Sequence, residues 1–554
     1  MQFKFLLSFF FICLITKISS QILPKENEIL NYNQLMFDCN GIKNASLYKF
    51  ILSEDSYDLG KEIFPEKKTQ IIFDSTQATL IKNLKFGRAY KWKVEGYDNA
   101  NKLIQTTSIH TFSLMFNDYG SEQKFMLKQA YNDKNNYKEG IIWCDLYHCA
   151  IDRAGTVVWQ FPLINKGLEK GRALRDLHLY PNGNLTFITD TNIYYISKDL
   201  EVLWSLKDDT SKVKPHFANY HHSFKRLENG NFIVLQAKSY FFKPENNDTA
   251  STIRFDDDFV VEYNPNGQEV WRWVTSEHFD LSIIKELAKI RKVKGVSIHL
   301  NSISIDETGN YIYLGFRDLS RIVKIERKTK KIIAQYGEKL TPFDTLVSET
   351  HLFRRQHDVR ILPNNELTLF NNNDVGLQNI SSALHLKIPE NKNDTLKPIW
   401  ELKLNFDTLS NGKAIRLGSV EQLPNGNYLI CTGENGRILE VTSSKKPVWD
   451  FRLYEKITVK DRFIKFPQYK IAFNSSLFPY YFTTTKDKNI LKLNNEGTES
   501  DSYKIELIGT FKTEIIQTQK IEPNKSYVLN LKNYKRFKKI KISSPISETE
   551  KIIK

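Results

Sequence analysis

Between about residue 135 and residue 455 the chain repeats one pattern of apolar and polar positions. In each copy an apolar run leads into a polar turn, often Pro-Asn-Gly-Asn, a second apolar run follows, and most copies later carry a tryptophan. Because both central residues of a tight hairpin turn take a positive φ, Asn-Gly between β-forming residues predicts a β-hairpin. The copies span 177–185, 224–232, 303–311, 359–367 and 420–428, and a partial copy spans 149–159.

This repeat predicts an all-β fold of the propeller class. Each copy carries several strands over roughly 45–80 residues, which is the size of a propeller blade with inserts. Five copies and the partial copy predict six blades. The segment 279–290 breaks the pattern, because its apolar residues have helical spacing among good helix formers, and we expect a helix between blades there.

The regions on either side of the repeats predict two further β modules. Residues 24–115 consist of short alternating segments separated by turn residues, which favours a small β-sandwich. The alternating stretch 90–97 resembles the later strands of a fibronectin type III domain. Short strands return after about residue 465. The predicted organisation is a fibronectin type III-like β-sandwich at 21–115, a six-bladed β-propeller at 116–460 and a small C-terminal β-module with a basic tail at 461–554.

The first 20 residues have the pattern of a secretory signal peptide. Lys4 precedes an apolar run at 5–15 that is too short to span a membrane, and the small residues Ser19 and Ser20 precede the expected cleavage point. The alternative, an N-terminal membrane anchor, needs about 18 or more apolar residues, and no later stretch has that length. We therefore expect an exported protein, periplasmic or secreted, without a membrane span.

The formal net charge of +15 raises the question of a nucleic-acid partner. Much of the excess lies in the lysine-rich tail at 532–541, whereas the middle of the chain mixes both signs. This distribution favours a solvated basic surface, with attraction of small anions as the second interpretation. We expect no nucleic acid among the partners.

Four cysteines remain beyond the predicted signal: Cys39, Cys144, Cys149 and Cys431. Export permits disulfides, and a turn between Cys144 and Cys149 would bring them together. Two buried thiols explain the same pair equally well. None of the spacings is that of a zinc ribbon.

Histidine is scarce, with 11 residues in 554, yet three histidines recur at related positions of the repeat. His222 lies eight residues before Gly230, and His357 lies eight before Asn365, which fills the same turn position. His299 lies two residues further from its own turn. Because a propeller arranges its blades around one axis, equivalent positions of successive blades converge, and we expect the three imidazoles at the mouth of the channel.

Arg317 adds a charge to this predicted cluster. It falls on the strand that follows the turn of the His299 repeat, and its guanidinium can bind two oxygens of a sulfate, phosphate or carboxylate. Each histidine alone is better explained as a structural residue, but the shared register beside an arginine favours a site. A histidine-rich metal site is the rival interpretation, and Arg317 counts against it because a guanidinium repels a divalent cation.

These motifs resemble a known family, the bacterial arylsulfotransferases that need no nucleotide sulfate donor. The resemblance covers roughly residues 135–455. The motifs that carry it are His221-His222-Ser223-Phe224 with Glu228-Asn229-Gly230-Asn231, His299-x-Asn301-Ser302-Ile303 with Phe316-Arg317-Asp318-Leu319-Ser320, Gln356-His357-Asp358-Val359 with Leu369-Phe370-Asn371-Asn372-Asn373, and Gly418-Ser419-Val420-Glu421 with Asn425-Gly426-Asn427.

The resemblance implies an arylsulfate sulfotransferase, which moves a sulfuryl group from an aryl sulfate donor to a phenolic acceptor by a ping-pong route. By the same resemblance His357 is the nucleophile. The residues that the resemblance assigns to binding and polarising the group are His222, His299, Asn301 and Arg317, with Ser419 at the hydroxyl position of the pocket. Neutral imidazole is a competent nucleophile and leaving group near neutral pH, so this chemistry requires no metal and no other cofactor.

Two features depart from the family pattern. The run Asn371-Asn372-Asn373-Asp374 stands where the family has Asp-Asn-Gly, and no cysteine pair is identified as the family's disulfide near the catalytic centre. Two other functions fit the sequence: a non-catalytic exported propeller that binds a glycan or a protein partner, and a metal-dependent propeller enzyme. The sequence does not indicate the oligomeric state.

Overall fold

The computed structural model describes most of the chain from residue 22 to residue 553, and the described part is all β apart from short 3-10 turns. The described ranges are 22–55, 67–117, 125–162, 174–189, 191–207, 220–242, 253–279, 295–340, 347–374, 379–391, 394–406, 411–457, 462–510, 512–534 and 537–553. The 3-10 turns in them are η2 (Thr275–Glu277), η3 (Leu404–Phe406), η4 (Gly433–Asn435) and η6 (Lys532–Tyr534). Within these ranges no helix has the length and apolarity needed to cross a membrane.

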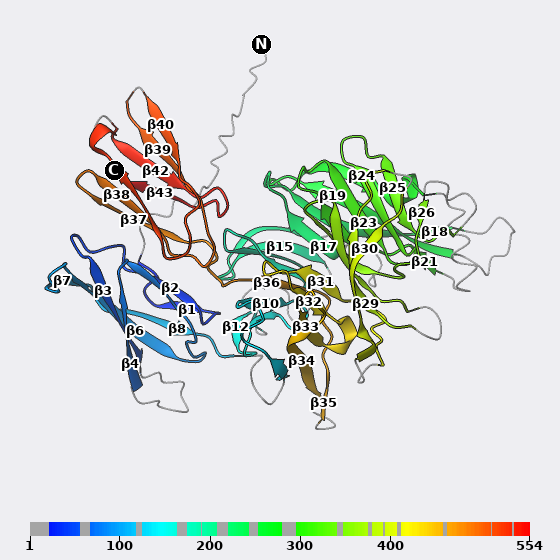
Figure 1. Ribbon diagram of the computed structural model, residues 1–554, viewed down its shortest axis with the longest axis horizontal. Helices are drawn as coiled ribbons and strands as arrows, with labels where there is room; N and C mark the ends of the chain where they lie inside the picture. The colour runs from blue at the N-terminus through cyan, green and yellow to red at the C-terminus, as the bar shows by residue number, and fades with distance from the viewer. Residues whose placement is uncertain are drawn as a thin grey trace, which may run out of the picture. The chain divides into compact units, whose positions relative to one another are not determined.

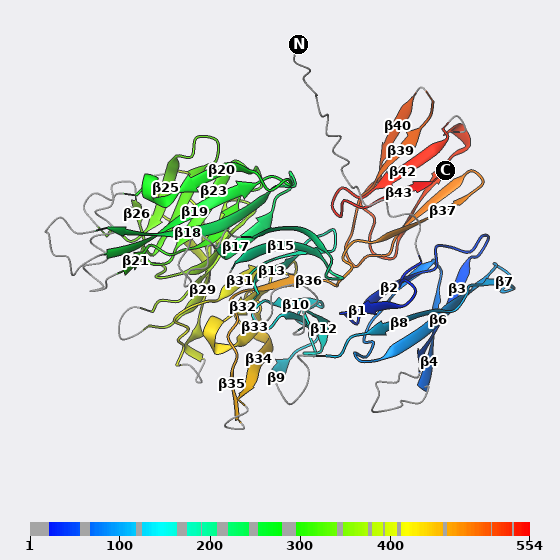
Figure 2. The same cartoon turned by 180° about the vertical axis from the view of Figure 1, so that it is seen from behind.

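The chain divides into two compact units, many of whose strands are labelled in Figure 1 and, from behind, in Figure 2. The repeat unit consists of residues 116–179 and 184–475, and the flanking unit consists of residues 1–115, 180–183 and 476–554. The repeat unit contains all five copies of the predicted hairpin pattern, apart from the 180–183 turn of the first copy.

The repeat unit is built from six mainly antiparallel sheets among its described residues. In strand order, the first sheet contains β36 (Ile471–Asn474), β10 (Ile141–Cys144), β11 (Cys149–Asp152) and β12 (Val157–Gln160), and the second contains β13 (Arg175–Leu179), β14 (Asn184–Ile188), β15 (Asn192–Ser197) and β16 (Val202–Lys207). The third sheet contains β17 (Tyr220–Arg226), β18 (Phe232–Phe242), β19 (Ile253–Tyr263) and β20 (Glu269–Val274), with β21 (Gly295–Ser297) beside β19, and the fourth contains β22 (Leu300–Ile305), β23 (Tyr311–Phe316), β24 (Arg321–Glu326), β25 (Ile332–Gly337) and β26 (Val347–Glu349). The fifth sheet contains β27 (His357–Leu362), β28 (Glu366–Asn371), β29 (Ser382–Lys387) and β30 (Lys397–Lys403), and the sixth contains β31 (Ser419–Gln422), β32 (Tyr428–Cys431), β33 (Arg437–Val441), β34 (Pro447–Ile457) and β35 (Arg462–Lys465), with β9 (Phe125–Asn132) beside β34.

The first strands of these sheets contact one another in turn. β36 contacts β13, and the contacts continue through β17, β22, β27 and β31 back to β36. The six sheets therefore follow one another around a common centre, which is a propeller-like arrangement.

Strand β36 joins the end of the repeat unit to its beginning. It pairs antiparallel with β10, with Ala472 opposite Trp143, although more than 300 residues separate them in the chain. The sequence boundary at residue 460 assigns β36 to the C-terminal module, whereas the repeat unit of the structure continues to Ser475. A four-residue strand without an Asn-Gly turn after it lacks the repeat pattern, so its membership of the first sheet was not visible in the sequence.

The recurring tryptophans link one sheet to the next through their indole N–H groups. Four of them lie on the fourth strand counted from the centre and donate to a turn carbonyl of the following sheet, which satisfies a donor that burial would otherwise leave unpaired. The bonds run from Trp159 to Lys198 (2.9 Å), from Trp271 to Arg327 (2.9 Å), from Trp400 to Ser443 (2.9 Å) and from Trp449 of the last sheet to Arg153 of the first (2.8 Å). The tryptophan of the sequence pattern is thus the contact between neighbouring sheets.

The predicted hairpin turns are confirmed. The turn glycines Gly183, Gly230, Gly309 and Gly426 have φ between +69° and +83°, a region that favours glycine. In the fourth copy, Asn364 and Asn365 take φ of +63° and +54° between β27 and β28, where asparagine tolerates the same left-handed region.

The flanking unit contains β sheets from both ends of the chain. In its N-terminal part a sheet of β1 (Glu28–Leu30), β8 (His110–Leu114), β6 (Ala89–Tyr97), β3 (Leu47–Asp55) and β4 (Lys67–Asp74), with β7 (Leu103–Thr106) beside β6, accompanies a sheet of β2 (Leu35–Asp38) and β5 (Ala78–Ile81). Phe37 of the small sheet packs edge-on against Trp92 of the large one, with ring centroids 5.0 Å apart, so the two sheets face each other as in a β-sandwich.

The C-terminal part of the flanking unit forms two further sheets. They consist of β37 (Phe482–Asp487), β38 (Ile490–Asn495) and β41 (Ser526–Asn530), and of β40 (Thr513–Gln517), β39 (Lys504–Ile508), β42 (Lys539–Ser543) and β43 (Glu550–Ile553). Buried Leu493, Ile505 and Ile542 belong to one hydrophobic cluster that joins these sheets. The region is rich in β-strands and belongs to the same compact unit as residues 1–115.

Two predictions lie outside the described residues: the signal peptide at 1–20 and, apart from Phe279, the helix at 279–290. The structure also shows whether Cys144 and Cys149 form a disulfide. Cys144 and Cys149 lie directly opposite each other on β10 and β11, and all four described cysteines are buried free thiols. The alternative of buried thiols therefore holds in this structure.

The tryptophan contact between the last and first sheets predicts a specific loss of stability. Trp449→Phe removes the indole bond to the Arg153 carbonyl, which should lower the free energy of unfolding by about 0.5–1.5 kcal/mol. Trp143→Phe is the matched control, because Trp143 is equally buried and its indole N–H has no partner among the described residues. Urea unfolding of both variants measures the difference, and equal losses would contradict the role of the bond.

Candidate active site

Irregular backbone at the starts of the central strands presents the three predicted histidines. His222 lies on β17 with φ of +59°, where the pairing with β18 shifts register. His299 directly precedes β22 and has φ of +56°. His357 is the first residue of β27, and the register shifts again immediately after it, with Asp358 at φ of +53°. Such bulges redirect side chains out of the regular alternation of a strand.

The structure brings the three histidines together. Nε2 of His222 lies 3.2 Å from Nε2 of His299, and their ring centroids are 4.9 Å apart. The ring of His357 lies 6.5 Å from that of His299. The side chain of Tyr469 packs edge-on against both His222 and His357, at 5.5 and 6.4 Å. The convergence expected from the repeat is therefore confirmed, although the three histidines differ in their backbone registers.

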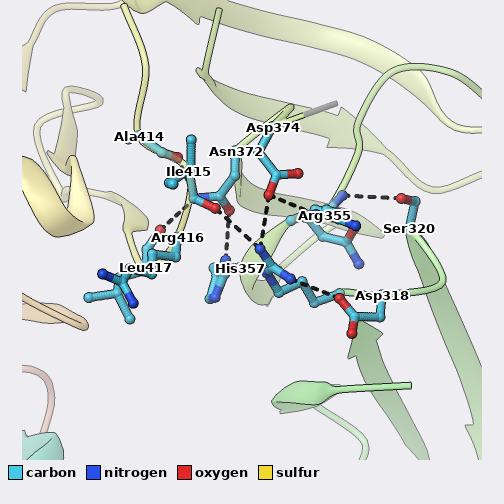
Figure 3. A network of polar contacts seen from close by, with 12 residues as sticks. Asp318, Ser320, Arg355, His357, Asn372, Asp374, Ala414, Ile415, Arg416 and Leu417 are labelled. Atoms are coloured by element: carbon cyan, nitrogen blue, oxygen red, sulfur yellow. Dashed lines mark hydrogen bonds and ion pairs between the residues drawn. The ribbon is translucent and has the colours of Figure 1, made fainter. Parts of the chain in front are cut away.

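A hydrogen bond to Asn372 fixes the protonation pattern of His357. The amide nitrogen of Asn372 donates to the carbonyls of Ala414 (2.7 Å) and Leu417 (2.9 Å), so its oxygen faces the imidazole. Nδ1 of His357 lies 2.6 Å from that oxygen and must carry the hydrogen. Figure 3 marks this bond between His357 and Asn372 with a dashed line. In the neutral ring Nε2 then bears the lone pair, which makes it the basic and nucleophilic nitrogen.

The imidazoles of the site are held neutral. Burial lowers the pKa of His357 from 6.5 to about 3, the bond to Asn372 opposes this shift, and the neighbouring His299, Arg317 and Lys470 add to it. Burial also lowers the pKa of His222 well below its usual value, and that of His299 less strongly. A neutral imidazole is the form that can act as a nucleophile or accept a proton.

Arg317 lies beside His299 and is held by two carboxylates. Its backbone N–H donates to the His299 carbonyl (2.9 Å), and its guanidinium donates to Asp318 (2.8 Å) and Asp374 (3.0 Å). Asp374 also binds Arg355 at 3.0 Å, and both residues are labelled in Figure 3, so its carboxylate bonds two guanidinium groups. The Nε–H of Arg317 is buried and has no hydrogen-bond partner in the described part of the chain. The guanidinium therefore keeps one donor for an acceptor that would enter the site.

Asn301 and Ser419 take structural positions in this arrangement. The Asn301 amide donates to the Gln356 carbonyl (2.8 Å), immediately before His357, and the backbone carbonyl of Asn301 accepts the Tyr469 hydroxyl (2.9 Å). The Ser419 hydroxyl is fully buried and accepts the backbone N–H of Ile471 (3.2 Å). Both predicted residues thus support neighbours of the cluster through the contacts observed here.

Tyr469 and Lys470 are the residues of the site that sequence reasoning missed. The Lys470 ammonium is buried and bonds the Asp176 carboxylate (2.9 Å), the His222 carbonyl (3.2 Å) and, at 3.5 Å, the carboxylate of Asp358. Burial disfavours its charge, but the two carboxylates outweigh this and raise its pKa. Both residues directly precede β36, outside every copy of the repeat, so the only sequence signal was their place before a short apolar run.

The buried neutral histidines predict that the protein loses stability in acid. The unfolded chain binds protons near pH 6.5 that folded His357 accepts only near pH 3, so the stability present above about pH 6.5 falls as the pH drops toward 3. His357→Gln should flatten this dependence of the unfolding midpoint on pH. His351→Gln is the control, because the His351 side chain is 67% exposed, and it should keep the wild-type slope. An unchanged slope in His357→Gln would refute the account.

Comparison with solved structures found many chains with partial likeness. One is a protein of unknown function from Bacteroides caccae, with 13% identity, a TM-score of 0.34, and coverage of 59% of this chain and 93% of that one. Another is the β-propeller domain of Cps50 (Swd1) from Myceliophteria thermophila, with 12% identity, a TM-score of 0.30, and coverage of 60% and 95%. A third, a luciferin-regenerating enzyme, has 8% identity, a TM-score of 0.29, and coverage of 62% and 99%. TM-scores this low do not support any statement about function.

A search of curated proteins found no match. The sequence model of the family named arylsulfotransferase (ASST), in contrast, matches residues 132–446, which is more than half of the chain and includes the three histidines and Arg317. This chain belongs to the arylsulfotransferase family.

Proposed function

We propose that the protein is an arylsulfate sulfotransferase, which transfers a sulfuryl group from an aryl sulfate to a phenol through a covalent intermediate on His357. The observation that carries the proposal is the bond between Nδ1 of His357 and Asn372, because it leaves Nε2 as a neutral nucleophile among two further imidazoles. Family membership supports the same reaction class.

In the first half-reaction Nε2 of His357 attacks sulfur, the N–S bond forms, and the bond from sulfur to the aryl oxygen breaks. The electron pair of that bond leaves with the phenolate. In the second half-reaction the oxygen of the acceptor phenol attacks sulfur, the N–S bond breaks, and His357 returns to its neutral form. His222 and His299 lie next to each other beside His357 and are the candidates to supply a proton to the first phenolate and take one from the acceptor.

Arg317 supplies positive charge for the sulfonyl oxygens. Its unpaired Nε–H is the donor that a sulfonyl oxygen would satisfy, while Asp318 and Asp374 hold the guanidinium in place. The remaining predicted binding residues have supporting roles in this proposal. Asn301 positions the backbone before His357, and Ser419 positions the strand that follows Lys470.

The proposal also covers the architecture of the protein, its location and its substrates. The ring of six sheets supports a six-bladed propeller, and the facing sheets near the N-terminus support a fibronectin type III-like sandwich. We also propose that the protein is exported, to the periplasm or beyond, and that its substrates are small aryl sulfates and phenols.

Incubation of the protein with p-nitrophenyl sulfate and phenol tests the reaction directly. Wild type should release p-nitrophenol and form phenyl sulfate, and the initial rates should follow ping-pong kinetics. His357→Ala should lower the rate at least about a thousandfold, because the covalent route is lost. No transfer by wild type, or full activity in His357→Ala, would show that the proposal is wrong.

The Asn372 bond makes a second, finer prediction. Asn372→Ala removes the acceptor that fixes the His357 tautomer, and kcat should fall about 10- to 100-fold. Asn371→Ala is the matched control, since Asn371 is an adjacent buried asparagine whose side chain bonds the Arg354 backbone and Ser382 and, among the described residues, makes no hydrogen bond with His357. Thermal unfolding of both variants separates loss of fold from loss of the tautomer. Equal losses of kcat would remove the special role of Asn372.

A further inference from the structure

Strand β17 carries a bulge at the point where it presents His222. The pairing of β17 with β18 shifts register between His221 and Phe224, so the two residues between them lie outside the ladder. Ser223 and Phe224 are each 1% exposed, so backbone groups that leave the ladder here need protein partners in place of water. The direction of the His222 ring therefore depends on what holds this bulge.

An ion pair from two other sheets bonds the bulge. Nζ of Lys470, directly before β36, lies 2.9 Å from a carboxylate oxygen of Asp176 on β13. Nζ also donates to the His222 carbonyl (3.2 Å) and to the Ser223 hydroxyl (3.1 Å). The second carboxylate oxygen of Asp176 accepts the backbone N–H of Phe224 (2.8 Å). The two side chains thus bond three successive residues of the bulged segment.

We propose that Lys470 and Asp176 are positioning residues, which hold the bulge and thereby keep the His222 ring against the ring of His299. The inference rests on the proposed sulfuryl transfer, in which His222 is a candidate to exchange a proton with the phenols. It gives the ion pair an effect on the reaction that is exerted through His222 and needs no contact with a substrate.

Both members of the pair are charged. Burial disfavours the charge of Asp176, but the ammonium groups of Lys470 and Lys225 outweigh this effect and lower the pKa of the carboxyl. Burial also disfavours the charge of Lys470, yet Asp176 and Asp358 outweigh it and raise the pKa of the ammonium. Hydrogen bonds from charged groups are stronger than those between neutral groups, so a charged pair holds the bulge more firmly than neutral partners would.

A third carboxylate fixes the backbone of both members. Asp145, in the turn between β10 and β11, is 1% exposed, and one of its oxygens accepts the backbone N–H groups of Lys470 (3.1 Å) and Asp176 (3.2 Å). Its other oxygen accepts the N–H groups of Tyr469 (3.1 Å) and Leu146 (2.7 Å). The two charged side chains therefore start from backbone positions that a single buried group holds next to each other.

A double-mutant cycle tests the inference. Lys470→Met removes the ammonium and keeps a long side chain, and kcat for transfer from p-nitrophenyl sulfate to phenol should fall about 10- to 100-fold, the usual effect of losing a group that orients a reacting side chain. KM should change less than about threefold, because the loss falls on the reaction step. In a His222→Gln background the same substitution should lower kcat by less than about threefold, since the ring on which Lys470 acts is already gone.

Arg437→Met is the matched control. Arg437 and Asp450, on β33 and β34, form an ion pair at 2.8 Å, and each of the two side chains is 10% exposed. Loss of this cation should lower the unfolding temperature, as Lys470→Met does, and keep kcat within about threefold of wild type. The comparison separates the loss of a buried ion pair from the loss of an oriented His222.

A variant without either charge keeps the test valid if Lys470→Met is unstable. Removal of the cation alone leaves a buried carboxylate without its partner, which destabilises a fold more than removal of both charges. In Asp176→Asn combined with Lys470→Met, asparagine keeps an acceptor for the Phe224 N–H and tolerates the φ of +55° at position 176. This doubly neutral variant should unfold at a higher temperature than Lys470→Met. Its kcat should remain about 10- to 100-fold below wild type, because the His222 carbonyl has lost its donor.

Hydrogen exchange examines the bulge without any substrate. Asp176→Gly removes the acceptor of the Phe224 N–H, and glycine adopts the φ of position 176 without strain. Peptides that cover 220–226 should exchange at least about tenfold faster than in wild type, whereas peptides that cover 357–362 should keep the wild-type rate. Asp450→Ala, which removes the carboxylate of the control pair, should leave exchange in 220–226 unchanged.

The outcomes separate the two proposals. Wild-type kcat in the doubly neutral variant, an equal loss of kcat with and without His222, or an equal loss in Arg437→Met overturns the positioning role and leaves the sulfotransferase proposal intact. Unchanged exchange of 220–226 in Asp176→Gly overturns it as well. A wild-type protein that transfers no sulfuryl group refutes the proposed function, and hydrogen exchange then still decides whether the ion pair holds the bulge.

Discussion

The site depends on the way a single late segment closes the ring of sheets. Strand β36 pairs with β10 of the first sheet, and the residue before it, Lys470, places a buried ammonium among three other strands. That ammonium binds Asp176 of β13, the carbonyl of His222 on β17 and the carboxylate of Asp358 on β27. A buried charge is tolerated only when it is paired, so these strands must meet for Lys470 to be satisfied. Closure of the ring and the pairing of Lys470 beside the cluster therefore depend on each other.

Within the ring, burial determines the charge of the histidines, and a hydrogen bond determines which nitrogen of His357 carries the hydrogen. Desolvation keeps His222, His299 and His357 neutral, since the charged form of each would lose more hydration than its neighbours replace. Asn372 then selects which nitrogen of His357 is bare. Arg317 contributes charge without neutralising the imidazoles, because Asp318 and Asp374 bind its guanidinium. The cluster thus combines a neutral imidazole with a fixed cation, which is the combination that the proposed reaction at an anionic sulfuryl group needs.

Local rules made much of this arrangement predictable. The Asn-Gly turns predicted the hairpins because φ is a property of the turn itself, and the spacing of His222, His299 and His357 from those turns predicted their convergence. The recurrence of tryptophan was visible in the sequence, but its structural role was not, because four of these side chains donate to a carbonyl of the next sheet. Tyr469 and Lys470 could not be predicted, since their roles arise from contacts between distant segments that no periodicity records. The roles of Asn301 and Ser419 were likewise set by neighbours on other strands.

The most direct test of the central claim is to identify the residue that carries the sulfuryl group. Wild-type protein would be mixed with an aryl sulfate in the absence of any acceptor, quenched under alkaline conditions that preserve sulfuryl-imidazole bonds, digested and analysed by mass spectrometry. The account predicts a stoichiometric gain of one SO3 group on the peptide that contains His357, with the group on Nε2. A label on His222, on His299 or on a residue outside the cluster, or turnover without any labelled histidine, would contradict it.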